Sequence, residues 1–269
     1  MLATGHTLRF SGPQNEEDNH HNGVGLLLTN TAHKSLLEWE PINDRILRAR
    51  FNSKFQEVTI IQCYAPTNLT DDNTKEDFYG HLQSGLDKVP KRDITIVMGD
   101  MNAKVGCNNT GKELIMGKQG VGDINENGEL FTDFCELNDL VIGGTIFAHK
   151  DIHKVTWTSP DKSVKNQIDH LAILRRWRTT LSDVRAYRGA EICSDHELLK
   201  AKLQVRIARV RTQGNTKSPR SDITKLKTPQ DKQEFSISLR NKFEALADAD
   251  ADSLENKWEQ VKNTFTVCL

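Results

Sequence analysis

The apolar run from Ile94 to Met98, followed at once by Gly99 and Asp100, constrains the fold more than any other feature of the chain. A short run of β-branched and apolar residues is typical of a strand buried inside a sheet. The glycine after it lets another stretch of backbone come close. The pattern therefore predicts a buried strand that delivers an acidic side chain at its end.

Other strands and two helices are expected around this one. The predicted strands are Gly23–Leu28, Val58–Tyr64, Val155–Thr158, Gln167–Ile173 and Leu198–Val205. A first helix is predicted from a capping box at Thr74 to Asp77, with Pro90 as its stop. A second helix, after a loop rich in Gly and Asn, is expected to end at Gly143-Gly144 with one apolar face, made of Leu130, Phe131, Phe134, Leu137 and Leu140.

This order of elements predicts an α/β fold in which two β-sheets pack face to face as a sandwich and are flanked by helices. The predicted domain covers residues 1–207. A polar linker is expected at 208–227 and a helical segment at 228–269. Thr228 is the expected N-cap of that helix, with Pro229 at its first position, and its apolar face is expected to hold Phe235, Leu239, Phe243 and Leu246.

Composition excludes several classes of protein. No run approaches the roughly 18 apolar residues that a membrane span requires, and the N-terminus resembles no secretory signal. The five scattered cysteines form no C-x-x-C pair, so neither a disulfide framework nor a zinc ribbon is indicated. We therefore expect an intracellular protein, nuclear or cytoplasmic, that needs no small-molecule cofactor. Its oligomeric state is left open.

The net charge of −1 gives the whole chain no nucleic-acid signature. Basic residues do cluster locally, in one stretch from Arg175 to Arg188 and in another from Arg206 to Lys227. Most such runs are solvated faces, and they gain meaning only where a phosphate site lies nearby.

Three acidic motifs stand where a predicted strand meets a loop. They are Gly99-Asp100-Met101-Asn102, Gln167-Ile168-Asp169-His170 and Ser194-Asp195-His196. Carboxylates in such places favour Mg²⁺ or Mn²⁺, and a neighbouring histidine can contact a phosphate or pass a proton. Asp100 and Asn102 are two residues apart, so they would point the same way in an extended strand. Each motif alone is more often a turn or a helix cap.

Taken in order, the motifs resemble the endonuclease/exonuclease/phosphatase superfamily. The matching segments are Gln62 to Thr67, Gly99 to Asn102, Thr156 to Thr158, Gln167 to His170 and Ser194 to His196. The wider segments Asp44 to Ile46, Ile61 to Asn68, Met98 to Gly106 and His153 to Trp157 are similar to the endonuclease domain of RTE-type non-LTR retrotransposons and to craniofacial development protein 2-like proteins. The tail resembles the segment before a reverse transcriptase.

This resemblance implies a metal-dependent DNA endonuclease that acts on the phosphate backbone. Asp100 would orient or deprotonate the attacking water, with Asn102 on a phosphate oxygen or on that water. Asp195 would bind the metal together with Asp100 and Asn102. His196 would stabilise charge on the phosphoryl oxygens, Asp169 would fix the His196 imidazole, and Tyr64 would donate to a phosphate oxygen.

The sequence departs from the family pattern at its beginning. Family members start with a strand that bears an Asn, followed by a strand whose Glu is the main metal ligand, and neither motif is found after Met1. The resemblance therefore implies an N-terminally truncated copy, incomplete in its fold and with little or no nuclease activity. Missing interior strands would leave backbone edges and apolar faces exposed in the remaining sheets.

Two other functions remain open from the sequence. The chain could be a non-catalytic, domesticated module that binds nucleic acid or protein. It could also be a phosphatase of the same superfamily acting on inositol phosphates or lipids, against which the retrotransposon-like segments argue. The hydrolase interpretation requires that Asp100, Asn102, Asp169, Asp195 and His196 converge on one pocket of phosphate size.

Overall fold

The structure is a computed structural model that describes residues 2, 4–12, 22–188, 194–205 and 228–247. The chain divides into two units, Met1–Ile207 and Ala208–Leu269. The predicted linker at 208–227, the second basic stretch and the end of the predicted helical segment lie outside the described residues.

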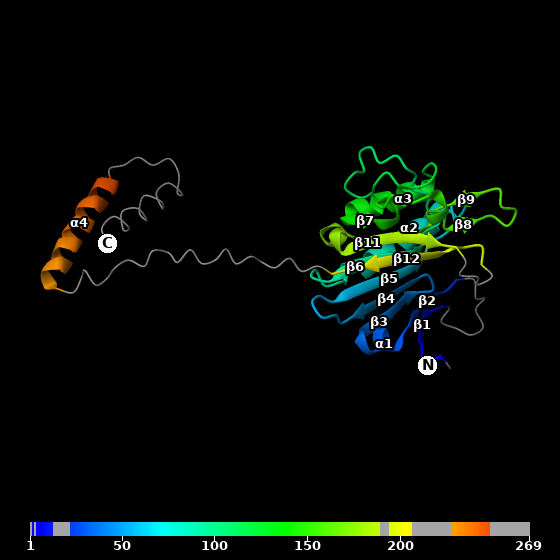
Figure 1. Ribbon diagram of the computed structural model, residues 1–269, viewed down its shortest axis with the longest axis horizontal. Coiled ribbons are helices and arrows are strands. Elements are labelled where there is room, and N and C mark those ends of the chain that lie inside the picture. The colour runs from blue at the N-terminus through cyan, green and yellow to red at the C-terminus, as the bar shows by residue number, and fades with distance from the viewer. Residues whose placement is uncertain (1, 3, 13–21, 189–193, 206–227, 248–269) are drawn as a thin grey trace. The chain divides into compact units, whose positions relative to one another are not determined.

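A six-stranded sheet forms the centre of the first unit (Figure 1). Its strands, in spatial order, are β3 (Leu36–Asn43), β4 (Ile46–Phe51), β5 (Val58–Tyr64), β6 (Ile94–Asp100), β10 (Asp169–Leu174) and β7 (Leu140–Ile142). β5 and β6 run parallel, and the other neighbours are antiparallel. A parallel pair needs a crossover, and helix α2 (Asp72–Asp87) supplies it.

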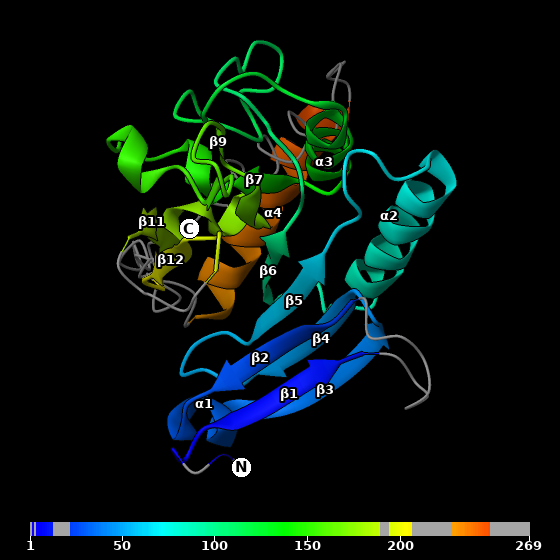
Figure 2. The ribbon, with the colours of Figure 1, turned by 90° about the vertical axis from the view of Figure 1, so that its right-hand side faces the viewer.

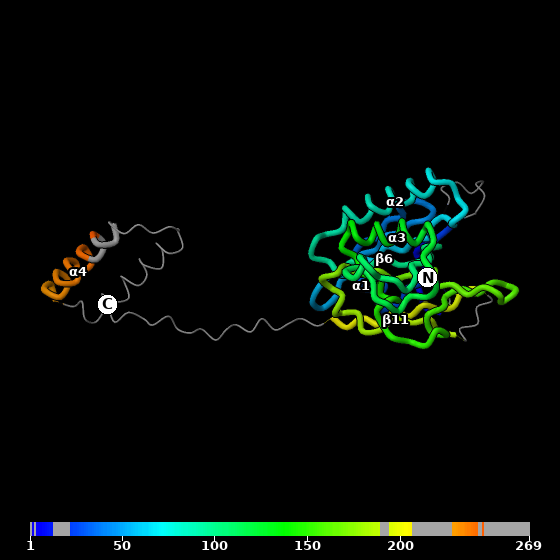
Figure 3. Tube along the Cα trace, turned by 90° about the horizontal axis from the view of Figure 1, so that it is seen from above, coloured from blue at the N-terminus to red at the C-terminus, as the bar shows by residue number. Residues whose placement is uncertain are grey.

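Helices α2 and α3 (Glu126–Leu137) cover one face of this sheet, as Figure 3 shows from above. Phe78 and Leu82 of α2 and Phe131 of α3 pack there against Ile61 and Val97 in one buried apolar cluster. Alternate residues of a strand face opposite ways, so the strand neighbours of Ile61 and Val97 point to the other side of the sheet. The predicted strand from Ile94 is therefore buried between two layers.

Two short sheets cover the opposite face (Figures 1 and 2). β1 (Thr7–Ser11) pairs with β2 (Val24–Leu28), and helix α1 (Asn30–Ser35) follows. β11 (Leu181–Tyr187) pairs with β12 (Leu198–Leu203). Each pair packs on its own apolar cluster of the central sheet. The predicted α/β fold with packed sheets and flanking helices is confirmed, with a second layer that comes in two halves.

The predicted capping box at Thr74 is wrong, because the N-cap of α2 lies three residues earlier. Asp71 is the N-cap, and its carboxylate accepts from the Thr74 backbone N–H at 3.0 Å and from the Thr74 hydroxyl at 2.8 Å. Thr74 thus lies inside the first turn and acts as a donor to the cap.

The predicted end of the second helix at Gly143-Gly144 is also wrong. α3 stops at Leu137, which is 79% exposed, and Leu140 opens strand β7. Asp139 adopts a positive φ of 52°, a conformation that reverses the chain after a helix. The same spacing of apolar residues therefore continues from helix α3 into strand β7.

The strand predicted at Val155–Thr158 is shorter than expected. Only Trp157–Thr158 forms β8, which pairs with β9 (Lys165–Asn166) as a small hairpin. Strands β1, β3, β4, β7, β9 and β11 were not predicted. β3 lies at the edge of the sheet and alternates irregularly, with bulges at two places in its pairing with β4, so its sequence lacks the period of a half-buried strand.

In the second unit the structure describes helix α4 (Pro229–Ala247). The predicted start is confirmed, since the Thr228 hydroxyl accepts from the Asp231 backbone N–H at 3.1 Å. Phe235 and Leu239, predicted to share one face, are half-buried there. Among the described residues, no helix has the length and apolar character needed to cross a membrane.

Candidate active site

Asp100 is fixed at the end of β6 by a close approach of two strands. Gly99 has a φ of +146°, and a Cβ built on it would lie 1.8 Å from the carbonyl oxygen of Cys63 in β5. Only glycine fits there. The Asp100 carbonyl then accepts from the Ala65 N–H at 2.8 Å. Gly99 is thus required by the close packing of β5 and β6, and this packing fixes the direction of the Asp100 carboxylate.

Asp169 lies directly across from Asp100, because β10 runs antiparallel to β6 with these two residues in register. The Met101 N–H donates to the Ile168 carbonyl at 3.0 Å. The Thr156 hydroxyl accepts from the backbone N–H groups of both Ile168 and Asp169, each at 3.1 Å. The second acidic motif is therefore fixed by backbone contacts on two sides.

The same threonine positions the third motif. The Glu197 N–H donates to the Thr156 carbonyl at 2.7 Å, and the Thr158 N–H donates to the Asp195 carbonyl at 3.1 Å. Trp157 forms a β-bridge with His196. Residues 156–158 thus hold the segment that carries Asp195 and His196 beside the start of β10.

Three side chains from these motifs meet. His196 Nδ1 lies 2.9 Å from Asp169 Oδ2, and His196 Nε2 lies 4.0 Å from Asp100 Oδ2. One ligand atom from each of Asp100, Asp169 and His196 lies within 4.8 Å of the others. All three side chains are half-buried. Residues separated by nearly a hundred positions in sequence therefore form one cluster, as the sequence predicted for these three.

The electrostatics of the cluster are unusual for an acidic group. Burial, with the nearby Asp169 charge, raises the pKa of Asp100 to about 6. The hydrogen bond that the Asp169 carboxylate accepts from the His196 ring raises the pKa of His196, which favours the imidazolium form. Two ionised carboxylates held close together repel each other unless a cation lies nearby. The cluster therefore favours a bound cation or a positive imidazole.

Asp195 lies at the side of this cluster. Its Oδ2 accepts from the Trp157 indole N–H at 2.7 Å, and its negative charge acts on both Asp100 and His196. The sequence left open whether Trp157 lies near the site, as the family resemblance implies, or is a plain core tryptophan. The structure shows that this indole orients an acidic side chain beside the cluster.

Asn102 departs from its prediction in one respect. It lies beyond the end of β6 with a φ of +47°, so the strand geometry expected to align it with Asp100 does not apply. Its backbone N–H donates to Asp100 Oδ1 at 2.8 Å, and its side-chain Nδ2 donates to the Ala65 carbonyl at 3.0 Å. Asn102 therefore fixes the Asp100 carboxylate through its backbone.

Tyr64 ends β5 beside Asp100, its register partner in the parallel pair. The Arg45 guanidinium lies over the Tyr64 ring, 5.2 Å from its centroid, and donates to the Tyr64 carbonyl at 3.2 Å. Arg45 belongs to a segment that carries the family resemblance, but the sequence indicated no role for it. The pair places a cation and a phenol next to the strand end that carries Asp100.

His170, next to Asp169 in sequence, belongs to the core. It is 1% exposed, its Nε2 lies 2.7 Å from the Ala103 carbonyl, and its ring packs 5.4 Å from Phe131. Burial lowers its pKa. It therefore remains neutral and does not face a ligand.

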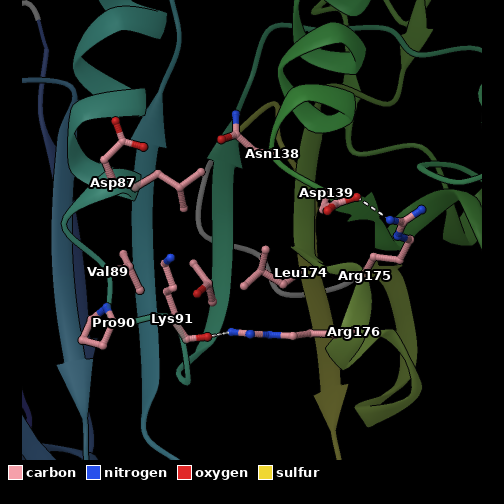
Figure 4. A pocket seen from close by; sticks show the side chains of 11 residues that line it. Asp87, Val89, Pro90, Lys91, Asn138, Asp139, Leu174, Arg175 and Arg176 are labelled. Atoms are coloured by element: carbon pink, nitrogen blue, oxygen red, sulfur yellow. Dashed lines mark hydrogen bonds and ion pairs between the residues drawn. The ribbon is translucent and has the colours of Figure 1, made fainter. Parts of the chain in front are cut away.

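The first basic stretch is largely paired. Arg175 binds Asp139 at 2.5 Å, Arg185 binds Asp183 at 2.6 Å, and Arg176 donates to the Lys91 carbonyl. Arg175 and Arg176 line a hollow of about 600 Å³ (Figure 4). This hollow lies past Leu174, at the end of β10 opposite to Asp169. Arg175 and Arg176 thus stabilise the fold away from the acidic cluster.

The donor set of the cluster fits a hard divalent cation. Mg²⁺ is held in proteins by one or two carboxylates and keeps several waters. Asp100 and Asp195 are carboxylates on neighbouring segments, whereas Asp169 is engaged with His196. The half-buried position of the cluster leaves access to solvent. These residues could therefore hold a metal ion.

Three known proteins place this arrangement in context. Craniofacial development protein 2 of Tragulus javanicus is 37% identical over 188 residues, which cover 69% of this chain and 32% of that protein. The chain thus spans about a third of the length of the curated relatives it matches. No protein-family model matches.

Two solved structures share the architecture. The endonuclease domain of TRAS1, a telomere-specific non-LTR retrotransposon, superimposes with a TM-score of 0.53 at 15% identity, covering 74% of this chain and 81% of that domain. The 3′ phosphatase NExo from Neisseria, bound to a product DNA hairpin, gives a TM-score of 0.52 at 16% identity, with 75% and 80% covered.

Proposed function

We propose that this chain, which has the endonuclease/exonuclease/phosphatase fold, hydrolyses phosphodiester bonds of DNA with the help of Mg²⁺ or Mn²⁺. The observation that carries the proposal is the meeting of Asp100, Asp169 and His196, with the Asp169–His196 hydrogen bond of 2.9 Å. A phosphodiester is anionic, so attack on it requires positive charge and hydrogen-bond donors. The DNA-bound fold relative supports a nucleic-acid substrate.

Each residue has a defined task in this proposal. Asp100 orients the attacking water and accepts its proton, and the Asn102 backbone N–H keeps the Asp100 carboxylate in place. His196, kept protonated by Asp169, donates to the phosphoryl oxygens as negative charge develops. Tyr64, under the Arg45 guanidinium, donates to a further phosphate oxygen.

Asp100 and Asp195, with Asn102 beside them, would hold a divalent cation, and the cation would supply additional positive charge to the phosphate. In the described part of the chain no glutamate joins the cluster of Asp100, Asp169 and His196. Few carboxylates at a metal site mean weak binding of the cation. We therefore propose slow hydrolysis that needs metal in the millimolar range, roughly the concentration at which weak sites fill.

The test is nicking of supercoiled plasmid with Mg²⁺ or Mn²⁺. Asp100→Asn should reduce nicking by about 100-fold or more, to background, because the variant loses the base and a metal ligand. Asp139→Asn is the matched control. Asp139 is another acidic residue, paired with Arg175, and asparagine tolerates its positive φ. The control should nick like the unaltered chain.

Equal nicking by both variants would point to a contaminating nuclease and contradict the proposal. Binding of DNA that weakens with salt, without any nicking, would favour a non-catalytic module instead.

A further inference from the structure

Helices α2 and α3 lie side by side on the central sheet and run in the same direction (Figure 3). Near their N-terminal ends, the Lys75 ammonium lies 3.2 Å from the Glu126 carboxylate. Towards their C-terminal ends, Gln83 Nε2 donates to the Asn138 side-chain oxygen at 2.9 Å, and the Asn138 amide donates back at 2.8 Å. The two helices are therefore linked near both ends.

A groove of about 550 Å³ lies between these two helices, and every residue that lines it belongs to α2 or α3. Its floor is apolar. The Tyr79 and Phe134 rings pack there with their centroids 5.6 Å apart, and Leu130 also lines it. Leu137, in the same lining, is 79% exposed. Apolar surface left in water costs about 25 cal/mol per Å² relative to burial, so the groove favours an occupant with an apolar side.

The rim of the groove is acidic. It consists of carboxylates from both helices, namely Asp72, Glu76, Glu126 and Asp133. The buried Lys75 ammonium lies between two of them, 3.7 Å from Asp72 and 3.2 Å from Glu126, and Lys112 lies 3.8 Å from Asp133. Glu76 is exposed and has no ion-pair partner within the described part of the chain. Four carboxylates therefore face two ammonium groups.

The excess of negative charge extends over both helices. Together α2 and α3 hold eight carboxylates and one lysine, a net charge of −7, whereas the whole chain carries −1. Neither helix has a basic residue in its last turn, where the helix dipole favours one, and Asp87 and Glu136 lie there instead. Such a surface repels a phosphate backbone and attracts a cationic partner.

The shape of the groove favours a helix as its occupant. Its lining runs from Asp72 to Gln83 on α2, which is about three turns and about 17 Å at 1.5 Å per residue. A third helix can pack into the furrow between two parallel helices. An extended strand would gain no backbone pairing there, because helices use their N–H and C=O groups internally.

The described part of the chain offers no helix of the required charge. Besides α2 and α3 it holds one helix of three turns or more, α4, with three acidic and three basic residues. A second copy of these helices therefore does not complement the acidic rim.

We propose that the groove between α2 and α3, defined by Glu76, Tyr79, Asp133, Phe134 and Leu137, binds an amphipathic helix of another protein whose apolar stripe is flanked by Lys and Arg residues. The stripe covers the aromatic floor, and the basic side chains on its two sides pair with the carboxylates of α2 and α3. The groove shares no residue with the cluster of Asp100, Asp169 and His196. Binding there requires neither metal nor DNA.

The test uses the full chain and three labelled peptides of about 18 residues, long enough to form a helix. The first carries Leu at positions three and four apart, flanked by Lys. It should bind with a Kd of about 10 µM or tighter, measured by fluorescence anisotropy. A scrambled peptide of the same composition, without a common apolar face, should bind at least about tenfold more weakly. The same helix with Glu in place of Lys should not bind.

Two leucine variants form a matched pair for the apolar part of the groove. Leu137→Ser removes apolar surface from the lining and should weaken binding by about fivefold or more. Because Leu137 is 79% exposed, this variant should stay folded. Leu114→Ser removes the same side chain outside both helices, where it is 67% exposed, and should leave binding unchanged.

A second pair tests the acidic rim. Glu76→Lys and Asp123→Lys change the net charge of the chain equally, but of the two exposed side chains only Glu76 lines the groove. At about 0.15 M salt, charges more than about 8 Å apart are largely screened. Glu76→Lys should therefore weaken binding by about threefold or more, and Asp123→Lys should leave it nearly unchanged.

Four results would overturn the proposal: the Lys-flanked helix does not bind, the scrambled peptide binds equally well, Leu137→Ser behaves like Leu114→Ser, or Glu76→Lys behaves like Asp123→Lys. Self-association of the chain that Leu137→Ser abolishes, measured by sedimentation without peptide, would also overturn it, because a second copy would then be the occupant. None of these measurements involves nicking, so their outcome is independent of the proposed hydrolase function.

Discussion

Two aspartates at opposite ends of strand β6 have opposite electrostatics. Asp93, directly before the strand, is 1% exposed and accepts from Arg50 and from the Thr59 hydroxyl, each at 2.7 Å. Burial acts to raise its pKa, but the hydrogen bonds from Arg50 and Thr59 outweigh it and lower the pKa. Asp100, at the end of the strand, has a pKa raised to about 6 by burial and by Asp169.

The pKa values of Asp93 and Asp100 differ because of the groups that surround each carboxylate, since both are aspartates at the ends of one strand. The charge of Asp93 is matched inside the protein, so this residue stabilises the fold. The charge of Asp100 faces a second carboxylate and a histidine that it meets only at 4.0 Å. Unmatched charge in a half-buried position is typical of a site whose partner is a ligand.

The largest expected effect comes from removing the matched charge. Asp93→Asn should lower the free energy of unfolding by about 2–3 kcal/mol, because Arg50 is left without its counter-charge. The value is below the roughly 3–5 kcal/mol of a fully buried pair since Arg50 is 26% exposed. Urea denaturation measures it. Glu40→Gln, which loses the more exposed pairs with Arg48 and Lys88, should cost about 1 kcal/mol or less; equal losses would contradict the comparison.

The next effect concerns orientation of the histidine. Asp169→Asn should reduce plasmid nicking by about 10- to 100-fold while the chain stays folded. Its hydrogen bond raises the pKa of His196, so the variant should lower that pKa. The protonated form, and with it activity, is then lost at a lower pH. NMR titration of His196 in the metal-free chain checks this, with Asp161→Asn, in the exposed β8–β9 hairpin, as the control.

The smallest effect is a gain. Asp100→Asn should raise the stability by about 1–2 kcal/mol at pH 7 to 8, although it abolishes activity. A carboxyl whose folded pKa of about 6 lies above its ordinary 3.8 is ionised at a cost in the folded state. The gain should grow as pH rises from 3.8 to 6 and be absent near pH 3.5. Thermal denaturation across this range, without metal, decides it; a gain that ignores pH would contradict the electrostatic cause.

The sequence predicted what depends on local pattern. Ile94–Val97 is buried on both faces of the sheet, and Val58–Tyr64 is buried on one face and half-buried on the other, as their apolar and β-branched residues indicate. The family resemblance carried by the ordered motifs implied that Asp100, Asp169 and His196 meet. What the sequence missed depends on contacts between distant segments. β3 is formed by pairing with β4, and the Trp157–Asp195 hydrogen bond joins residues 38 positions apart.

The conformation of Asn102 was missed for a related reason. The chain leaves the strand at Asp100, and the amide of Asn102 turns to the Ala65 carbonyl instead of continuing the pleat. The end of α3 was missed because Leu140 continues the apolar spacing of the helix while belonging to a strand. The spacing of apolar residues does not show where a helix ends when the strand after it continues the same spacing.

Thr156 has a consequence for how this protein can vary. The buried Thr156 forms hydrogen bonds with the backbone of Ile168, Asp169 and Glu197. The spacing of the acidic side chains is therefore set by Thr156 and not by the hairpin that follows. The hairpin tip from Ser159 to Val164 is held by its own internal hydrogen bonds. Its length and sequence are therefore free to diverge while the acidic side chains keep their places.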